Sequence, residues 1–541
     1  MATELKVALA QLEFIVGDIP GNAEKVINAA QEALQQGADV VVFPELTLAG
    51  YPPEDLLLRP ALGPRIESAL ETIKKARLPI HMVLGYPERI GDHLYNRAAV
   101  IYEDRMLVEY SKQHLPNYQV FDEKRYFSRG SDSGLVTIRG VPCAVTICED
   151  IWFDGPAERA AQAGAQVLFN INASPFHLNR DQQRRDRVQE VAQHLNLAIV
   201  YVNHICGQDE LVFDGGSMVV DGGGVQHTLP TYEECLETVC LKQTNNGVKV
   251  EAGTVLPERP LLESLYQALV LGLRAYVDRN GFKGVVLGLS GGIDSGLSLA
   301  IAVDALGADR VQAVMMPYEY TSQMSKDDAQ EEAELLGVKY EVLPIGSIFE
   351  AGMTTLSPLF EGLAADTTEQ NLQARIRGML LMAISNKTGF MVLTTGNKSE
   401  LAVGYATLYG DMCGGYNALK DVPKTLVFEL SRYRNTLSPV IPQRVIDRPP
   451  SAELAPDQKD EDSLPPYEVL DELIERYVER DESAEAIIAA GFDRDTVYRV
   501  VRLIDINEYK RRQAPEGVRI TPRGFGRDRR YPITNGWKPG H

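Results

Sequence analysis

The stretch VVLGLSGGIDS, residues 285–295, decides the fold of the second half of this 541-residue chain. Apolar and β-branched residues lead into Ser290-Gly291-Gly292, and an apolar segment typical of a helix follows. Glycine permits a tight bend and close approach of a ligand, while the serine hydroxyls and the free N–H groups at a helix start attract anions. The pattern therefore predicts a strand, an anion-binding turn and a helix.

Asp294 lies inside this predicted anion site, where it would repel a phosphate unless a cation separates the two. We therefore expect Asp294 to hold Mg²⁺ and the turn to hold the pyrophosphate of a nucleotide. A nucleophile elbow, G-x-S-x-G, would need a later histidine, but only His541 follows Ser290. A Walker A loop would need a lysine after the glycines. A purely structural strand–turn–helix corner is the remaining alternative.

The turn resembles the S-G-G-x-D-S pyrophosphate loop of the N-type ATP pyrophosphatases, a superfamily that includes NAD, GMP, asparagine and argininosuccinate synthetases. The resemblance implies a carbonyl oxygen activated as an adenylate, AMP displaced by a nitrogen nucleophile, and release of pyrophosphate. It also implies a doubly wound, parallel, Rossmann-like α/β sheet that binds its nucleotide at the carboxyl end of the first strand. The loop alone does not choose among the members.

Periodicity predicts two α/β domains, because the chain is too long for one core and alternates strands with helices. We expect a first domain at 1–250, a linker at 251–260 and a second domain at 261–541, with turn and proline signals between them. Strands are expected at residues 5–10, 40–43, 81–84, 98–102, 144–147, 167–170, 199–203, 285–289, 311–316 and 391–394. Helices are expected at residues 22–36, 155–163, 180–195, 261–280, 327–336 and 372–384.

Charge and cysteine usage narrow the class of protein. The net charge of −21 argues against a nucleic-acid partner, and no apolar run reaches the roughly 20 residues of a membrane helix. Six cysteines without a C-x-x-C pair indicate neither disulfides nor zinc. Because the first residues lack the basic start of a signal peptide, we expect a cytoplasmic protein.

Two late segments have unusual charge. Residues 451–466 combine five acids with three prolines, which indicates a mobile loop or an exposed connection. Residues 510–541 hold nine lysines and arginines against two acids. This basic segment could embrace a phosphorylated substrate, dock on a neighbouring subunit or form a solvated tail.

Three segments of the first half each place a reactive residue at the end of a predicted strand: Glu45, Lys112 and Cys148. A base, a cation and a sulfur nucleophile suffice for covalent acyl transfer, with the lysine neutralising an oxyanion. The alternative is structural, since free cysteines such as Cys143 are often buried as small apolar groups, and Glu149 beside Cys148 would raise its thiol pKa.

The motifs around these residues are F-P-E-L-x-L-x-G-Y at 43–51, S-K-x-x-L-P at 111–116 and I-C-E-D-x-W at 147–152. They resemble, in the same order, the Glu–Lys–Cys signature of the nitrilase, or carbon–nitrogen hydrolase, superfamily. The resemblance implies a four-layer αββα sandwich for the first half. It also implies an amidase that forms a thioester on Cys148.

A nitrilase-like amidase followed by an ATP pyrophosphatase resembles the glutamine-dependent NAD⁺ synthetase family over nearly the whole chain. Residues 368–377, 393–400, 405–412 and 420–425 look like further motifs of that family. The resemblance implies a ligase of NAD biosynthesis that uses L-glutamine or ammonia, ATP, deamido-NAD⁺ and Mg²⁺. It further implies a buried ammonia channel and a homo-oligomer formed through the synthetase domain.

The resemblance also implies residue roles. Glutamine hydrolysis falls to Glu45, Lys112 and Cys148. The candidates for the glutamine site are Tyr118, Glu123, Ser174 and Arg180, whose planar fork suits a carboxylate. The candidates for ATP are Gly288, Leu289, Ser290, Gly291, Gly292, Ile293, Asp294, Ser295, Thr395 and Lys424. The candidates for deamido-NAD⁺ are Asn371, Arg375, Glu400, Asp411 and Lys510. The expected metal ligands are Asp294 and Glu400.

Two other functions were weighed against this one. Other amidotransferases, such as GMP or asparagine synthetase, generally use amidases of other folds, and residues 395–412 fit them poorly. A non-catalytic nucleotide-binding scaffold is disfavoured because both halves carry complete sets of motifs. Release of pyrophosphate from ATP in the presence of deamido-NAD⁺ distinguishes an enzyme from a scaffold.

Overall fold

The computed structural model describes residues 3–245, 247–251, 253–451, 453–455 and 464–537. The chain forms two compact units, one comprising Met1–Gln208 and Val212–Glu258, the other Asp209–Leu211 and Arg259–His541. Within the described residues, no helix has both the length and the apolar character needed to cross a membrane.

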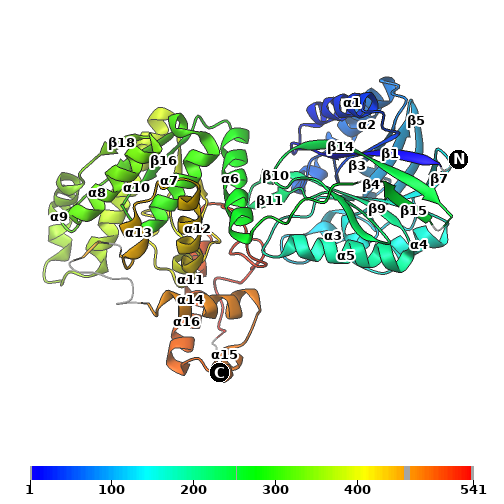
Figure 1. Cartoon of the computed structure of the whole chain (residues 1–541). Helices are drawn as coiled ribbons and strands as arrows, with labels where there is room; N and C mark the ends of the chain where they lie inside the picture. Colours follow the sequence, from blue (N-terminus) through cyan, green and yellow to red (C-terminus); the bar gives the residue numbers. More distant parts are fainter. Residues whose placement is uncertain (1–2, 246, 252, 452, 456–463, 538–541) are drawn as a thin grey trace. The chain divides into compact units, whose positions relative to one another are not determined.

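The first unit contains two large sheets and a small hairpin (Figure 1). The seven-stranded sheet has the order β15 (Gly247–Glu251), β14 (Cys235–Thr244), β1 (Glu4–Gln11), β2 (Val40–Val42), β3 (His81–Ile90), β4 (His93–Tyr102) and β5 (Arg105–Ser111). The six-stranded sheet has the order β13 (Gly224–Thr228), β12 (Met218–Asp221), β9 (Ala198–Asn203), β8 (Val167–Asn172), β7 (Val141–Ile147) and β6 (Leu135–Ile138). The hairpin joins β10 (Ile205–Gln208) to β11 (Leu211–Asp214). Both large sheets are mixed, because parallel pairs such as β1–β2 and β7–β8 lie beside antiparallel ones.

The two sheets face each other and helices cover their outer faces, which gives the expected four-layer αββα sandwich. The helices of this unit are α1 (Ile19–Gln35), α2 (Leu62–Lys75), α3 (Glu123–Tyr126), α4 (Pro156–Gln162) and α5 (Arg180–Leu195). Alternate residues of one strand serve different layers: Val167 and Phe169 of β8 enter the core between the sheets, whereas Leu168 packs in the core that includes Val188 of α5. Side chains alternate across a strand, so a strand that is apolar throughout must be covered on both faces.

The second unit is built on one parallel sheet of five strands. Their order is β18 (Lys339–Val342), β17 (Val311–Met315), β16 (Val285–Gly288), β19 (Met391–Thr394) and β20 (Tyr416–Asn417). The first strand, β16, therefore lies between the second and the fourth, where the winding of the chain reverses. Ligands of doubly wound sheets bind beyond the carboxyl ends of the strands at this point, and residues 289–292 follow β16 there.

Helices cover both faces of this sheet, as expected for the Rossmann-like class. Helices α6 (Leu261–Arg279), α7 (Ile293–Leu306) and α12 (Lys424–Leu437) pack on one another, while α10 (Thr367–Thr388) packs on β16 and β19. The remaining elements of the sheet region are α8 (Gln323–Leu336), α9 (Gly346–Phe360), α11 (Lys398–Val403) and α13 (Gln443–Asp447).

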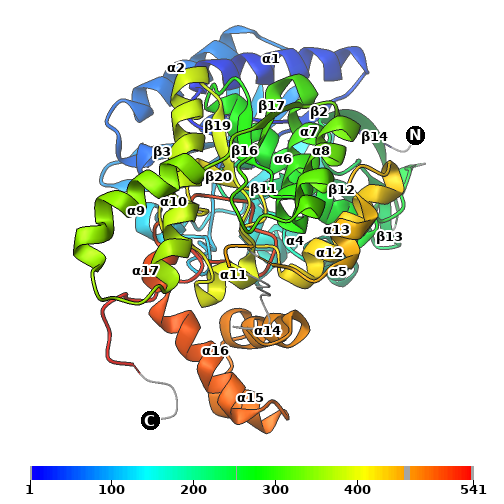
Figure 2. The same ribbon diagram turned by 90° about the vertical axis from the view of Figure 1, so that its left-hand side faces the viewer.

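A helical lobe follows the sheet region (Figure 2). It consists of α14 (Tyr467–Ile474) with a π-helical extension (Glu475–Glu479), α15 (Ala484–Ala489), α16 (Arg494–Ile506) and α17 (Glu508–Arg511). Its apolar core includes Leu470, Ile487 and Val500 and continues into Ala402 of α11. We call residues 464–529 the C-terminal lobe.

The basic segment is folded into the lobe up to residue 529, whereas residues 532–537 are exposed. Arg511, Arg519 and Arg529 are all buried, and each forms an ion pair with a buried carboxylate, either Glu508 or Asp528. Ion pairs within the fold thus account for basic residues whose role the sequence alone does not show. Of the acidic segment at 451–466, residues 452 and 456–463 lie outside the described residues, so the expectation of a loop stays a prediction there.

Candidate functional site

The first unit gathers three charged side chains with almost no exposure. The Lys112 ammonium lies 2.7 Å from Glu45 Oε1 and 2.8 Å from Glu123 Oε1, and all three residues are buried. Asn96 donates to Glu45 Oε1 at 2.7 Å, and the backbone N–H of Ala173 donates to Glu45 Oε2 at 3.1 Å. These hydrogen bonds fix the direction of the Glu45 carboxylate, as a general base requires.

Cys148 begins a short 3₁₀ turn (Cys148–Ile151) directly after β7 and is 6% exposed. Its φ of 42° lies in the left-handed region, which a residue with a Cβ seldom adopts and which is frequent at functional turns. Asp150 holds the turn beside the end of β5, because its carboxylate accepts hydrogen bonds from the backbone N–H groups of Gln113 and Ile147 and from the Tyr110 hydroxyl. Cys148 and Lys112 are thereby brought to one place.

Burial and neighbouring charges set the protonation of this centre. Burial raises the pKa of the Cys148 thiol well above its usual value, Glu45 raises it further, and Lys112 opposes both effects. Burial alone would lower the pKa of Lys112, but Glu123 and Glu45 raise it well above normal. Burial also raises the pKa of Glu123. The resting centre therefore holds a neutral thiol that feels the charges of both Glu45 and Lys112.

Two groups of opposite charge flank the thiol. Glu149 is buried and accepts a hydrogen bond of 2.7 Å from the half-exposed Tyr118 hydroxyl. The Arg180 guanidinium stacks 4.2 Å from the centroid of the Trp152 ring and lies 3.5 Å from Ser174 Oγ. Both Tyr118 and Arg180 are close enough to Cys148 for their charges to be coupled to it. A carboxylate and a guanidinium on either side of a thiol match the two charged ends of an α-amino acid.

Arg184 bonds to Ser174 and lies close enough to Arg180 for its charge to act on it. It is fully buried, pairs with Asp214 at 2.8 Å and donates to the Ser174 carbonyl at 2.8 Å and to Ser174 Oγ at 3.2 Å. Burial, followed by the charge of Arg184, lowers the pKa of Arg180. Because Asp214 pairs with Arg184, Arg184 bonds to Ser174 beside Arg180 without adding net charge to this corner.

In the second unit, the turn between β16 and α7 has the predicted form. Gly291 has a φ of 78°, and a Cβ there would lie 2.2 Å from the carbonyl oxygen of Ser325, so only glycine fits. The hydroxyls of Ser290 and Ser295 are 3.0 Å apart, and Ser290 Oγ accepts from the N–H of Gly292. The first N–H groups of α7 lie at the same turn, which is the arrangement that binds phosphate.

Both predicted metal ligands converge on one lysine. The Lys424 ammonium lies 2.5 Å from Asp294 Oδ2 and 3.2 Å from Glu400 Oε1. Asn397 donates to Asp294 Oδ1 at 2.9 Å and, as the N-cap of α11, accepts from the N–H of Glu400 at 3.0 Å. Two hard carboxylate ligands around one cation form a donor set that also suits Mg²⁺.

A cavity of about 330 Å³ opens at this edge of the sheet. The ATP candidates that line it are Gly288, Leu289, Ser290, Gly292, Ile293, Asp294, Ser295, Thr395 and Lys424. Gly291 instead forms the back of the turn, where its carbonyl accepts a hydrogen bond from Arg448. Arg377 also lines the cavity; it donates to the Met316 carbonyl at 2.9 Å, and burial lowers its pKa to about 10.

The candidates for deamido-NAD⁺ surround one loop at residues 404–411. Asn371 accepts from the Thr407 hydroxyl, Arg375 donates to the Leu408 carbonyl, and Lys510 donates to the Gly404 and Ala406 carbonyls. Asp411 accepts from the Thr407 N–H and, with Glu400, lines the cavity. Asn371, Arg375 and Lys510 are thus gathered around the loop rather than on the cavity wall.

Sequence reasoning missed several residues of these sites. Asn397 had a usable signal, because asparagine before a short helix is a typical N-cap. Arg377 ends the 368–377 motif but was not singled out, whereas Asn96 and Arg448 had no signal, since each reaches its site from a distant part of the chain. Asp150 has a sequence signal only as part of the 147–152 motif, which does not show that its carboxylate accepts hydrogen bonds from two loops.

Two protein families match this chain, one for each half. The carbon–nitrogen hydrolase family matches residues 6–233, and the NAD synthase family matches residues 265–514. Over 99% of both chains, the sequence is 50% identical to the glutamine-dependent NAD(+) synthetase of Acinetobacter baylyi. The chain belongs to the glutamine-dependent NAD⁺ synthetase family.

Other members of the glutamine-dependent NAD⁺ synthetase family support the same assignment. The enzyme of Thermotoga maritima is 45% identical over 99% of both chains. The solved structure of the Acinetobacter baumannii enzyme in complex with ADP is 48% identical, covers 100% of both chains and has a TM-score of 0.81. The enzyme of Cytophaga hutchinsonii, at 20% identity and a TM-score of 0.85, shares the fold over 99% of this chain and 98% of its own.

Proposed function

We propose that this chain makes NAD⁺ from deamido-NAD⁺, ATP and the amide nitrogen of L-glutamine. The observation that carries the proposal is the presence of two complete and different centres in one chain. One is a buried thiol with a carboxylate base and an ammonium, and the other is a phosphate-binding turn beside two carboxylates. The first centre suits amide hydrolysis and the second suits adenylation.

In the first reaction, Cys148 Sγ attacks the amide carbon of glutamine while its proton passes to Glu45. The carbon–nitrogen bond then breaks, ammonia leaves with a proton from Glu45, and a thioester remains. Water, deprotonated by Glu45, hydrolyses the thioester to glutamate and restores the thiol. Lys112, whose ammonium contacts Glu45, would stabilise the negative oxygen that forms at the carbonyl.

The flanking charges would select glutamine among amides. We assign the α-carboxylate to Arg180, with Ser174 beside it, and the α-ammonium to the corner formed by Glu149 and Tyr118. Glu123 remains beside Lys112, where it shares the ammonium with Glu45 and supports the base. A simple aliphatic amide has neither charged end and would leave both corners unpaired, which costs binding energy.

In the second reaction, the carboxylate of deamido-NAD⁺ attacks the α-phosphorus of ATP and pyrophosphate leaves. We propose that the turn at 290–295 binds the phosphates and that Asp294 and Glu400 would hold Mg²⁺. The metal would supply charge neutralisation at the phosphates. Lys424 adds a mobile positive charge at the same place, and Thr395 lies at the cavity wall on the nucleotide side.

Deamido-NAD⁺ is assigned to the region around the 404–411 loop. Arg375 and Lys510 carry positive charges, and Asn371 and Asp411 offer polar contacts, so this region suits a dinucleotide with anionic groups. Ammonia then attacks the adenylated carbonyl carbon, AMP departs, and loss of a proton leaves the amide. Ammonia already carries the lone pair it needs, which explains how a domain whose only histidine is His541 can perform the step.

Three further features of the proposal concern the whole protein. Free ammonia would be protonated in water, so we propose that it passes between the centres without release. We also propose that the synthetase unit binds a second copy of itself, since α9 has no buried residue and Leu359 and Met379 are exposed at 75% and 54%. Six free cysteines and the use of ATP fit the cytoplasm.

A comparison of nitrogen sources tests the proposed function. Purified protein receives ATP, Mg²⁺ and deamido-NAD⁺ with either glutamine or an ammonium salt, and AMP, pyrophosphate and NAD⁺ are measured. Both sources should yield NAD⁺ with one AMP and one pyrophosphate per turnover. Absence of ATP cleavage with either source would contradict the proposal. Sedimentation of the pure protein tests the expected homo-oligomer, which a strictly monomeric species would exclude.

A further inference from the structure

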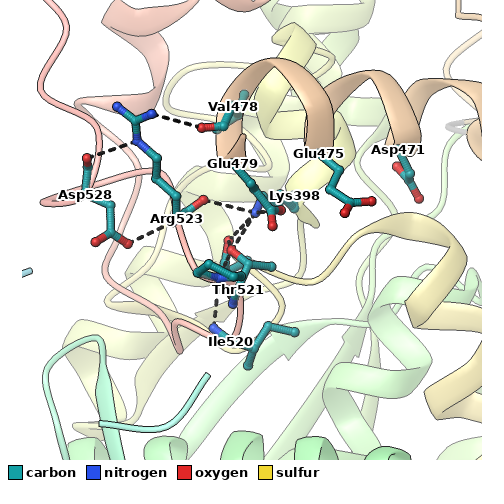
Figure 3. Close-up of polar contacts among 12 residues, drawn as sticks. Lys398, Asp471, Glu475, Val478, Glu479, Ile520, Thr521, Arg523 and Asp528 are labelled. Atoms are coloured by element: carbon teal, nitrogen blue, oxygen red, sulfur yellow. Dashed lines mark hydrogen bonds and ion pairs between the residues drawn. The ribbon is translucent and has the colours of Figure 1, made fainter. Parts of the chain in front are cut away.

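The C-terminal lobe is fastened to the underside of the nucleotide site through Lys398. Its ammonium is fully buried and lies 2.8 Å from Asp421 Oδ1, 2.7 Å from Glu479 Oε1 and 2.7 Å from the Thr521 hydroxyl (Figure 3). Lys398 is the first residue of α11, and Asn397, the residue before it, is the N-cap of this helix. Because of this bond network, α14 lies against the starts of α11 and α12.

The start of α12 depends on the lobe for its cap. The N-cap residue of α12 is Pro423, which has no side-chain acceptor for the first N–H groups of the helix. Asp471 of α14 replaces it: its Oδ2 accepts from the Thr425 N–H at 2.9 Å and from the Thr425 hydroxyl at 2.8 Å. The Ser399 hydroxyl donates to Asp471 Oδ1 and accepts from the Lys424 N–H at 2.8 Å.

The two helix starts that are bonded to Asp471 also carry Glu400 and Lys424, which line the nucleotide cavity. Ser399 precedes Glu400, and Thr425 follows Lys424, whose ammonium contacts Asp294 and Glu400. Tyr467, one helical turn before Asp471 on α14, places its ring 5.3 Å from that ammonium. Asp471 therefore bonds to Ser399 and Thr425, which are the immediate chain neighbours of Glu400 and Lys424.

We propose that Asp471 is a positioning residue for ATP and metal binding, acting from the C-terminal lobe through Ser399 and Thr425 on Glu400 and Lys424. This inference rests on the proposed function, because it concerns the placement of groups assigned to ATP and Mg²⁺. A loss of the cap frees the first turn of α12 and widens the range of positions that Lys424 and Glu400 occupy. The reaction then needs more nucleotide and more metal, while the fold persists.

The chain provides a matched control in the same lobe. Asp493 caps α16 with the same bonds, accepting from the Thr496 N–H at 2.9 Å and from the Thr496 hydroxyl at 2.8 Å, but it is exposed and does not line the nucleotide cavity. Asp471→Ala and Asp493→Ala remove the same kind of cap. Only the first should alter the nucleotide site if Asp471 has the proposed role.

The experiment measures ammonia-dependent NAD⁺ formation by the full-length protein, so that the amidase centre is not involved. For Asp471→Ala we expect the KM for ATP and the half-saturating Mg²⁺ concentration to rise about fivefold, the factor that corresponds to the typical loss of one helix cap. Asp493→Ala should stay within about twofold of wild type, and Asp471→Asn, which keeps an acceptor for Thr425, should fall between the two.

The possible outcomes separate this inference from the proposed function. If the wild type itself fails to cleave ATP with deamido-NAD⁺ and ammonia, the proposed function fails. If the wild type is active and both alanine variants change alike, or if neither shifts the ATP and Mg²⁺ requirements, the positioning role is wrong. Should Asp471→Ala not fold, Ser399→Ala and Asp471→Asn carry the same test, and unchanged requirements in both would refute the role.

Discussion

At the scale of single residues, Cys148 combines a strained backbone with a thiol that holds its proton. Its backbone is left-handed and burial raises the pKa of its thiol, so activation requires a base, the role that we propose for Glu45. Cys143 of the same strand is also buried, burial raises its pKa to about 12, and its thiol donates to the Val141 carbonyl at 3.4 Å. The two cysteines therefore make a natural comparison.

Replacing Cys148 with alanine should abolish glutamine-dependent NAD⁺ synthesis and leave ammonia-dependent synthesis intact, because only the amidase loses its nucleophile. Cys143→Ala is the control and should retain both activities within a few-fold. NAD⁺ formation with each nitrogen source is the measurement. Normal use of glutamine by the Cys148 variant would show that the thiol is not the nucleophile.

Glu332 of α8 gives a prediction about stability and pH. Its carboxylate is fully buried beside Gly296 of α7, and neither oxygen has a hydrogen-bond partner among the described residues. Burial, with a contribution from Asp328, raises its pKa to about 8. The unfolded chain would release this proton near the ordinary glutamate pKa, so stability falls as the pH rises between the two values, by up to about 1.4 kcal/mol per pH unit.

The variant Glu332→Gln removes that titration. Between pH 5 and pH 8 its free energy of unfolding should therefore rise relative to wild type, as measured by urea denaturation at several pH values. The exposed neighbour Glu334, changed to glutamine, should leave the pH dependence of wild type in place. A parallel pH dependence in Glu332→Gln and wild type would mean that the carboxyl is not protonated in the folded protein.

At the scale of elements, sequence patterns predicted only some of the strands and helices, and the amphipathic helices α2, α14 and α16 were not among them. The helix at 180–195 and the strand at 391–394 were predicted with their observed bounds, and the turn at 290–295 has its predicted form. The short strands β18 and β20 were missed, since β18 is mostly exposed and β20 has two residues, too few for a periodic signal. Patterns of apolar residues report burial, and neither strand provides one.

The polar part of the junction between α11 and the C-terminal lobe also escaped prediction, because its residues pair across long separations in sequence. Lys398 is its centre: burial alone would lower the pKa of this lysine, but Asp421 and Glu479 raise it. Removing the ammonium leaves two carboxylates without their common partner in a buried place. Such a loss is strongly destabilising even where the intact pair adds little net stability.

Lys398→Met should therefore lower the urea midpoint of the second unit, with a cost of about 3–5 kcal/mol in the free energy of unfolding. The matched control is Lys387→Met, which changes an exposed lysine near the end of α10. Unfolding is followed by circular dichroism, together with protease resistance of the lobe. Equal midpoints for the two variants would mean that the buried charge cluster does not hold the lobe.

At the scale of the whole molecule, the family resemblance rested on motifs spread over both halves, and full-length relatives bear it out. The roles of individual residues in the second unit remain predictions, because substrate contacts depend on where loops such as 404–411 meet the ligand. Composition and periodicity carry no information on which loop residues contact a ligand. Composition and periodicity likewise do not predict the number of subunits or the transfer of ammonia.

An isotope experiment tests ammonia transfer directly. Wild-type protein receives glutamine labelled with ¹⁵N at the amide together with an equal concentration of unlabelled ammonium. Transfer without release predicts NAD⁺ that carries mostly ¹⁵N, as read by mass spectrometry, whereas Cys148→Ala should yield only unlabelled NAD⁺. Product whose label follows the mixed pool of free ammonia would show that the nitrogen escapes into solution.

The position of Lys424 between Asp294 and Glu400 has one more consequence. Its ammonium lies between the two carboxylates and offsets part of their negative charge. A divalent ion that binds without nucleotide would have to compete with this ammonium for the two carboxylates. A triphosphate would offer the ammonium another anionic partner and so would free the carboxylates for the metal. Loading of metal and nucleotide is thus expected to be cooperative, and magnesium alone should bind only feebly.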